Sequence, residues 1–394
     1  MKRSGLELCL LGALLAPASF ALTLISGHAQ GFPYELFPVG PLRPAAQGGF
    51  HYADDVNEAG IVSGFFKEDT DGSSDVFLWD SISASFLPLG SLPTGFTNRV
   101  APARLNNSNH LVGHAHGLIG VRAFVSSDGI TTILDDLPGS TLPGAIGGIA
   151  HDINDSGFVV GQSGVRNPTI WIDEIPIPLQ LLPGFIGGLA QGINEDGQVA
   201  GYICKDTSCS LRGAVLWTNN VPTLLGPESE FSEAQSVNDI GIVGGYQLFP
   251  ASPQHCGGPR LTIWNSTGIL RQIPALGFVF DINNSNLAVG TTTLGSAGCT
   301  TNFAFLWDEE NRIFDLNNQI DPRIGWRLIE AHGINDFGQI VGRAKNQFGN
   351  EQGFLLTPTG EPLVLHPTVV PAPASLSLFT LSLAGLLVLR RRLA

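Results

Sequence analysis

The sequence is poor in charge and in two of the residues that favour helices. Charged side chains make up 14% of the 394 residues, against about 25% in typical soluble domains. Lysine occurs four times and methionine once, and both are strong helix formers. These shortages exclude a helical bundle, and a hydrophobic fraction of 43% excludes a disordered chain.

The shortage of basic residues also excludes a class of partner. Twenty Lys and Arg residues stand against 34 Asp and Glu residues, which gives a formal net charge of −14. A surface of this sign does not neutralise phosphates, so we expect no nucleic-acid binding. Glycine is abundant instead, with 49 residues, and glycine favours the turns of a β-rich fold.

The N-terminal residues have the layout of a cleavable secretory signal. Lys2 and Arg3 precede an apolar run over 6–15, and small residues follow near Ala21 and Ala29. This order of basic, apolar and small residues is typical of signal peptides. The sequence therefore predicts a signal peptide over 1–29 and export by the secretion machinery.

The C-terminal residues form a second targeting layout over 369–394. The motif at its start comprises Val370, Pro371, Ala372, Pro373 and Ala374. An apolar segment predicted as a transmembrane helix over 374–389 follows, and three arginines end it. This layout resembles the PEP-CTERM sorting signals of exported bacterial proteins, with Ala372 where the family has glutamate.

That resemblance implies processing by an exosortase-type membrane protease. The protein would be anchored transiently in the membrane through this helix, and would then reach the cell surface or the extracellular space. The alternative is an ordinary C-terminal membrane anchor.

Between the two ends one motif recurs seven times. An apolar residue and an asparagine precede a polar turn, an apolar pair and a glycine. The motif asparagines are Asn57, Asn106, Asn154, Asn194, Asn238, Asn283 and Asn335. Their mean spacing of about 46 residues is typical of propeller blades and of helical repeats. Proline and glycine in each unit, without helical periodicity, exclude the helical repeats.

Each unit divides into four short strands, and several third strands end in tryptophan, as at Trp79 and Trp307. Four-stranded units stacked radially bury their apolar faces and leave only short edges. The sequence therefore predicts an all-β fold, a seven-bladed β-propeller of four-stranded antiparallel repeats over 32–366. We expect residues 34–42 to pair with the last unit and close the ring, with 363–365 competing for that place. An open solenoid is the alternative geometry.

The repeat also resembles a known family. Its clearest copies are Phe-Ala-Phe-Leu-Trp at 303–307 and Ile-Asn-Asp-Phe-Gly-Gln-Ile-Val-Gly at 334–342. This pattern resembles the HAF repeat of extracellular bacterial proteins. The resemblance implies export and a repeat architecture, and it supplies no catalytic residues.

Polar residues just before the motif asparagines are the candidate ligand-binding set. They are Asp54, Asp55, Arg104, His151, Asp152, Gln191, Gln235, Asp281 and His332. In a closed propeller these positions converge on the central channel, where several blades can hold one ligand. His151, Asp152 and His332 are the candidate acid or base groups. The alternative is that the set packs and hydrogen-bonds between blades.

Two further polar features have structural and functional interpretations. The motif asparagines are interpreted as turn residues, followed by a glycine with positive φ. Separately, the loop with Asp69, Asp71 and Asp75 resembles a calcium loop, although Lys67 stands where the first carboxylate belongs. The alternative is an acidic, solvated hairpin. Calcium is the one cofactor that the sequence suggests.

These observations predict a non-catalytic binding or structural module at the bacterial cell surface, with extracellular polysaccharide as the expected partner. No His-Glu-x-x-His or Gly-x-Ser-x-Gly spacing is present. The alternative function is a propeller enzyme, a polysaccharide lyase or a glycosidase, with its site at the channel mouth. A passive coat protein without a ligand is a third interpretation.

Four cysteines remain after removal of the signal peptide: Cys204, Cys209, Cys256 and Cys299. An even number in an exported chain favours disulfides, and three pairings are possible. Pairing of Cys204 with Cys209 would close one hairpin, and pairing of Cys256 with Cys299 would bridge neighbouring blades. A zinc cluster is disfavoured because no Cys-x-x-Cys pair occurs.

We expect mass spectrometry of the unreduced, exported protein to find no free thiol among these four cysteines. Peptide mapping would then show which of the three pairings is present. Four free thiols would contradict the disulfide interpretation.

Overall fold

A computed structural model describes residues 32–40, 49–67, 74–118, 120–139, 147–227, 231–250, 257–293, 302–310, 312–361 and 363. The predicted signal peptide over 1–29 and the predicted transmembrane helix over 374–389 lie outside these residues. Within them, no helix has the length and apolar character needed to cross a membrane.

The described residues form an all-β fold of antiparallel sheets. The first sheet comprises β2 (Phe50–Val56), β3 (Ile61–Lys67), β4 (Ser74–Asp80) and β5 (Ser85–Leu87). The second comprises β6 (Phe96–Leu105), β7 (Leu111–Gly117), β8 (Gly120–Ser127) and β9 (Ile130–Ile133). The third comprises β10 (Ile149–Ile153), β11 (Val159–Ser163), β12 (Asn167–Ile172) and β13 (Ile175–Pro178). The fourth comprises β14 (Gly187–Ile193), β15 (Val199–Cys204), β16 (Arg212–Thr218) and β17 (Val221–Leu224).

The next sheet has seven strands because one long strand serves two units. It comprises β18 (Ser232–Val237), β19 (Val243–Phe249), β20 (Gly258–Asn265), β21 (Gly268–Ile282), β22 (Ala288–Thr293), β23 (Phe303–Trp307) and β24 (Ile313–Asp315). The first half of β21 pairs with β20, and its second half pairs with β22. Two short 3-10 turns follow, η1 (Leu316–Asn318) and η2 (Pro322–Ile324).

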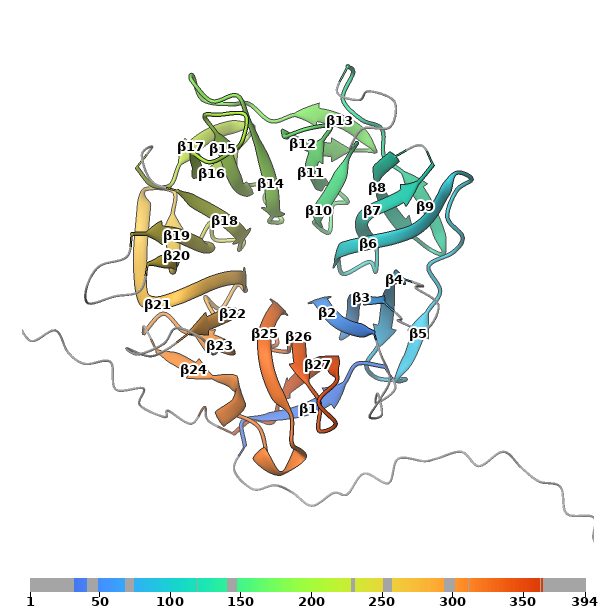
Figure 1. Cartoon of the computed structure of the whole chain (residues 1–394), viewed down its shortest axis with the longest axis vertical. Coiled ribbons are helices and arrows are strands. Elements are labelled where there is room, and N and C mark those ends of the chain that lie inside the picture. Colours follow the sequence, from blue (N-terminus) through green and yellow to red (C-terminus); the bar gives the residue numbers. More distant parts are fainter. Residues whose placement is uncertain are drawn as a thin grey trace, which may run out of the picture. The chain divides into compact units, whose positions relative to one another are not determined.

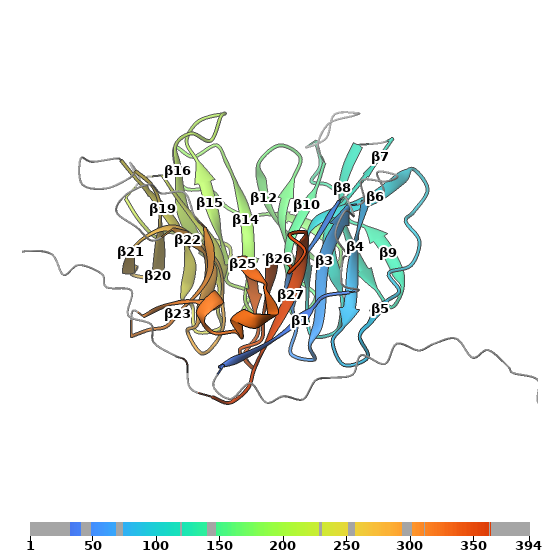
Figure 2. The same ribbon diagram turned by 60° about the horizontal axis from the view of Figure 1, so that its bottom comes forward.

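The last sheet joins the two ends of the described chain. It comprises β25 (Arg327–Ile334), β26 (Ile340–Lys345), β27 (Glu351–Pro358) and β1 (Tyr34–Pro38). Strand β1 pairs with β27 from Tyr34 opposite Pro358 to Pro38 opposite Phe354, and Figure 2 shows the two strands side by side. The predicted pairing of the N-terminal segment with the last unit is therefore confirmed.

The sheets lie around a common axis, with the first strand of each unit nearest the centre (Figure 1). This radial arrangement of four-stranded antiparallel sheets is that of a β-propeller. The core lies between neighbouring sheets, where the third-strand side chains Trp171, Trp217 and Trp264 are almost completely buried. The indole N–H of Trp217 also donates to the carbonyl of Gln180 in the preceding unit, at 2.7 Å.

The glycine of the Val-Val-Gly element is required by a bulge in the neighbouring inner strand. Register shifts by one residue between Ala150 and Asp152 of β10, and Ala150 lies opposite Gly161 of β11. A Cβ on Gly161 would lie 2.0 Å from the carbonyl oxygen of Ile149. Only glycine leaves room for that carbonyl, so the motif glycine and the bulge require each other.

Each motif asparagine closes its own turn. The Oδ1 of Asn154 accepts the backbone N–H of Phe158 at 2.9 Å, and the same i to i+4 bond recurs in every copy of the motif. The third residue after each motif asparagine has positive φ. It is glycine in most copies, as in Gly157 with φ of 80°, and asparagine in others, as in Asn109 with φ of 62°. The turn interpretation of these asparagines is confirmed.

The same asparagines also bond the repeats to one another. The Nδ2 of each donates to the backbone carbonyl of the next motif asparagine, at 2.9–3.1 Å. The seventh bond runs from Asn335 to the carbonyl of Asn57 and completes a circuit. A second circuit of hydrogen bonds runs beside the first. The backbone N–H of the residue after each motif asparagine donates to a side-chain oxygen of the equivalent residue in the following repeat, at 2.7–2.9 Å.

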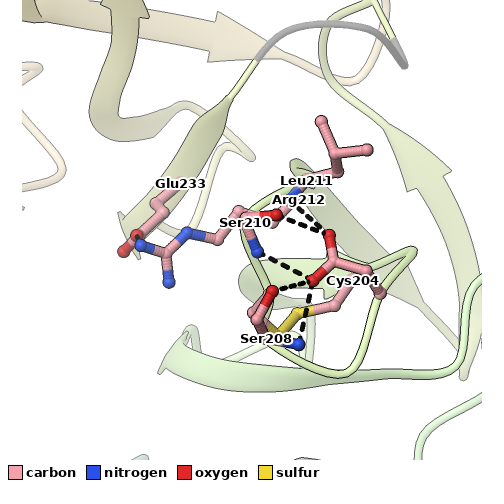
Figure 3. Close-up of a disulfide and its surroundings, with 8 residues drawn as sticks. Cys204, Ser208, Ser210, Leu211, Arg212 and Glu233 are labelled. Carbon is pink, nitrogen blue, oxygen red and sulfur yellow. Dashed lines mark hydrogen bonds and ion pairs between the residues drawn. A yellow bond between two sulfur atoms is a disulfide. The ribbon is translucent and has the colours of Figure 1, made fainter.

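A disulfide joins Cys204 and Cys209 between β15 and β16, with Cα atoms 5.0 Å apart (Figure 3). The Asp206 carboxylate orders the enclosed loop, because it accepts backbone N–H bonds from Ser208 and Leu211. Of the three pairings that the sequence leaves open, the structure therefore contains the one that closes a hairpin. Cys256 and Cys299 lie outside the described residues.

Replacing one motif asparagine should weaken the whole ring. Asn154→Ala removes both the turn bond and the bond to the carbonyl of Asn194, leaving buried backbone groups without partners. We expect the free energy of unfolding to fall by about 1–3 kcal/mol, measured by urea denaturation. Ser156→Ala on the same exposed turn is the matched control and should change stability little. Equal losses in the two variants would contradict the role of the circuit.

Candidate functional site

The bulges divide the predicted channel residues into two levels. Register shifts of one kind recur in the inner strands, for example between Ala53 and Asp55 and between Val279 and Asp281. One level holds the bulged residues Asp54, His151, Gln191, Gln235 and His332. The level one residue further along the chain holds Asp55, Arg104, Asp152 and Asp281.

The aspartates of the second level fasten neighbouring repeats. Each accepts the backbone N–H of the residue that follows it. Each also accepts a backbone N–H of the next repeat, in the pairs Asp55 with Leu105 (3.2 Å), Asp152 with Ile193 (2.9 Å) and Asp281 with Ile334 (2.9 Å). These carboxylates therefore act as bridges between inner strands.

Arg104 lies among these aspartates. Its Nη1 is 3.6 Å from Oδ1 of Asp55, and its guanidinium donates to the carbonyls of Asp54 and His332 at 3.3 and 3.5 Å. Burial alone would lower the pKa of Arg104, but the surrounding carboxylates, with Asp55 first, raise it above its ordinary value. The guanidinium stays charged and links inner strands that are far apart in the sequence.

Burial changes the protonation of the other channel groups. It raises the pKa of Asp55 to about 6 and that of Asp152 to about 7, against the opposing charge of Arg104. It lowers the pKa of His151 to about 4, with His114 and Arg104 adding to the effect. His151 is therefore neutral at pH 7, and Asp152 changes charge near that pH.

A cavity of about 430 Å³ opens beside the first level. It is lined by Tyr52, Asp54, Arg104, Phe280, Glu330, His332 and Arg343. Its volume falls within the range of small-ligand sites, roughly 300–1,000 Å³. Of the predicted acid or base groups, His332 lines this cavity, whereas His151 and Asp152 are outside its lining. The three are therefore not brought together in this cavity.

Four lining residues, Tyr52, Phe280, Glu330 and Arg343, are not among the predicted channel residues, although the strand pattern indicates two of them. Tyr52 and Glu330 lie two residues before Asp54 and His332 on the same inner strands, and side chains two apart share a face. Arg343 follows the motif glycine of β26. Phe280 stands at the bulge position, where other repeats have polar residues. Because it is apolar, a search for polar residues in the inner strands does not find it.

His332 is the centre of the cavity's polar contacts. Its Nδ1 lies 2.8 Å from the carbonyl oxygen of Ala53, and its Nε2 lies 3.1 Å from Oε2 of Glu330. A carbonyl and a carboxylate only accept, so each of these contacts is a hydrogen bond where the facing ring nitrogen carries the proton. Oδ1 of Asp54 lies 3.8 Å from Nδ1. The rings of Tyr52 and Phe280 contact the imidazole edge to face, at 5.8 and 5.7 Å.

Glu330 is held in its charged form by His332 and Arg343. Burial alone would raise its pKa, but His332 and Arg343 together lower it below the ordinary value. Arg343 bridges Glu330 at 3.0 Å and Glu351 at 3.3 Å. The cavity therefore presents a paired set of charges beside two aromatic rings.

Gln191 and Gln235 belong to a second polar cluster. Both side-chain amides donate to Oε2 of Glu233, at 3.2 and 3.3 Å. Glu233 in turn pairs with Arg212 at 2.9 Å. The guanidinium of Arg212 lies over the rings of Tyr202 and Phe231, at 4.8 and 4.1 Å.

The predicted calcium loop is described only in part. Asp69 and Asp71 lie outside the described residues. The Asp75 carboxylate pairs with the Arg99 guanidinium at 3.0 Å and accepts the N–H of Val76 at 2.9 Å. Over the part of the chain that the structure describes, no three His, Cys, Asp or Glu side chains are grouped to hold a metal ion.

The fold is that of a β-propeller, and residues of its inner strands line the cavity. No protein-family model matches the chain, and no curated protein matches it either. Among solved structures, it is similar to a gluconolactonase from Xanthomonas campestris, with 11% identity, 82% of this chain and 98% of that chain covered, and a TM-score of 0.39. It is also similar to TolB from Acinetobacter baumannii, with 10% identity, coverages of 84% and 80%, and a TM-score of 0.34. Similarities at this level carry no argument about substrate or reaction.

Asp152 and His151 should make the free energy of unfolding depend on pH, and their two effects should have opposite signs. The pKa of Asp152 rises on folding from 3.8 to about 7, so its contribution is complete below pH 4 and is lost as the pH rises toward 7. The pKa of His151 falls on folding from 6.5 to about 4, so its contribution is complete above pH 6.5 and is lost as the pH falls toward 4.

Two variants separate these contributions. We expect the stability of the wild type relative to Asp152→Asn to decline as the pH rises from about 4 to about 7. Relative to His151→Gln, it should decline as the pH falls from about 6.5 to about 4. Denaturant unfolding across this pH range measures both differences. Parallel profiles for wild type and both variants would contradict the assignment.

Proposed function

We propose that this chain is an exported, surface-associated, seven-bladed β-propeller that binds extracellular polysaccharide at its channel mouth without changing it chemically. The observation that carries the proposal is the cavity of about 430 Å³. In it, Tyr52 and Phe280 lie beside the charge-paired set of His332, Glu330 and Arg343.

The blade count is supported by the hydrogen bonds that join the repeats. Seven asparagine side chains bond in sequence, and the last returns to the carbonyl of Asn57. The seven-stranded sheet contains two motif copies, Asn238 and Asn283, on either side of the long strand β21. Counted this way, each motif corresponds to one blade, and β1 supplies the fourth strand of the last blade.

Sugars fit the chemistry of this cavity. A sugar ring has apolar C–H faces and hydroxyl edges, and an aromatic face is electron-rich, so C–H groups pack well against it. Hydroxyls donate to carboxylates and accept from arginine and imidazolium. Tyr52 and Phe280 provide aromatic surface, and Glu330, Arg343 and His332 provide acceptors and donors around it.

Export and processing complete the proposal. The signal peptide over 1–29, the HAF-repeat resemblance and the PEP-CTERM-like segment over 369–394 support secretion followed by sorting through an exosortase-type protease. The disulfide between Cys204 and Cys209 agrees with an oxidising compartment. The remaining cysteines, Cys256 and Cys299, are proposed to form the second disulfide.

A propeller glycosidase or lyase is the second candidate. One observation favours it: the carboxylates of Asp54 and Glu330 both line the cavity, with His332 between them. Most glycosidases use a pair of carboxylates beside the scissile bond. Against this role, Glu330 is charge-paired with both His332 and Arg343, which stabilises its ionised form and makes it a poor proton donor.

Binding and turnover measured on one panel of polysaccharides test the proposal. We expect at least one polysaccharide to bind and to be recovered unchanged. Phe280→Ala should weaken that binding by about tenfold, which corresponds to about 1.4 kcal/mol, because it removes an aromatic wall of the cavity. Phe337→Ala is the matched control, since this phenylalanine is 70% exposed and does not line the cavity.

Shortened or unsaturated products would support the enzyme instead, and their loss in Asp54→Asn and Glu330→Gln would assign the chemistry to this cavity. A panel on which nothing binds would contradict both candidates.

A further inference from the structure

An aromatic arc leads from the cavity to the second polar cluster. We define the arc as Phe231, Tyr246, Phe278, Phe280, His332 and Tyr52. Successive ring centroids lie 6.3, 4.8, 6.0, 5.7 and 5.8 Å apart in that order. The contacts are unbroken, although the residues come from β19, β21, β25 and β2 and from the segment just before β18.

The two ends of the arc have the same polar chemistry. At one end, Glu330 pairs with Arg343 at 3.0 Å. At the other end, Glu233 pairs with Arg212 at 2.9 Å. Glu330 and Glu233 stand at equivalent places, each immediately before the alanine that precedes the bulged residue of its inner strand. The structure therefore repeats one acid–arginine pair on both sides of a row of rings.

The rings of the arc are partly open. Tyr52, Phe278, Phe280 and Phe231 are half-buried, and only Tyr246 is fully buried, at 8% exposure. Phe231 also packs against the Arg212 guanidinium, so the far end is rigidly held. Pre-ordered aromatic faces bind with little further loss of side-chain entropy.

We propose that the arc binds a neutral, linear polysaccharide over several sugar residues, with the cavity holding one part of the chain and the Arg212–Glu233 cluster another. This inference rests on the proposed function. Five successive ring contacts are more than one sugar residue covers, so the occupant is a chain. Both acids are paired with arginines, which suits uncharged hydroxyls better than a charged ligand.

The test is a comparison of chain lengths with the full exported protein. Calorimetric titrations use linear gluco-, xylo-, manno- and galacto-oligosaccharides of two and six residues, and a linear uronate series of the same lengths. In at least one series, we expect the longer sugar to bind at least about tenfold more tightly, because each added contact forms on a chain that is already held.

Two variants at the Arg212–Glu233 end of the arc test whether this end causes the tighter binding of the longer sugar. Phe231→Leu keeps an apolar side chain against Arg212 but removes the aromatic face, and it should reduce a tenfold length preference to roughly twofold. Tyr202→Leu removes the other ring that the Arg212 guanidinium lies over, at 4.8 Å; it should lower the length preference in the same direction and serves as the second variant if the first is poorly folded. Phe337→Leu is the matched control and should keep the wild-type preference.

The outcomes separate this inference from the proposed function. Equal affinity for two and six residues in every series that binds would overturn the arc and leave the cavity site standing. Equal weakening of short and long sugars by Phe231→Leu would do the same. Tighter binding of a uronate series would overturn the neutral character of the ligand. Absence of binding in every series would contradict the proposed function itself.

Discussion

The hydrogen bond from each motif asparagine to the backbone carbonyl of the next repeat is the interaction on which the rest of the structure depends. One amide serves two purposes, because its oxygen closes a turn and its nitrogen reaches the neighbouring repeat. Seven such bonds return to Asn57. A repeat that slid along the axis would break two of them, so the circuit sets the height of every inner strand.

That common height explains the two levels of channel residues. In six of the seven inner strands the bulged residue lies three positions before the motif asparagine, so residues such as Asp55 and Asp152 come to the same depth. Carboxylates gathered at one depth would repel one another. The structure offsets this repulsion with backbone N–H donors from the next repeat and with the guanidinium of Arg104, and burial leaves Asp152 with a raised pKa.

The candidate site is built from the positions that differ between repeats. The asparagine and the glycine of the motif recur in each unit and hold the ring together. The places beside them carry Tyr52 in one repeat, Phe280 in another and Glu330 in a third. A repeated scaffold thus brings unlike side chains from distant parts of the sequence to one mouth of the channel, where a single ligand can contact several of them.

The sequence alone determined the repeat, the all-β class, the four-stranded units, the turns and the closing strand. All of these depend on local chemistry or on a period that is visible along the chain. It also identified Asp54, Arg104 and His332, because polar residues in a buried strand stand out.

Only the tertiary structure decided which channel residues meet. His151 and His332 occupy the same repeat position, yet only His332 lines the cavity, because Tyr52 and Phe280 from the neighbouring inner strands and Glu330 from its own strand lie beside it. The partners of the motif asparagines were equally invisible, since a side-chain amide bonding a carbonyl 40 to 52 residues ahead leaves no local pattern. Contacts between repeats depend on how the ring closes, and that is a property of the folded chain.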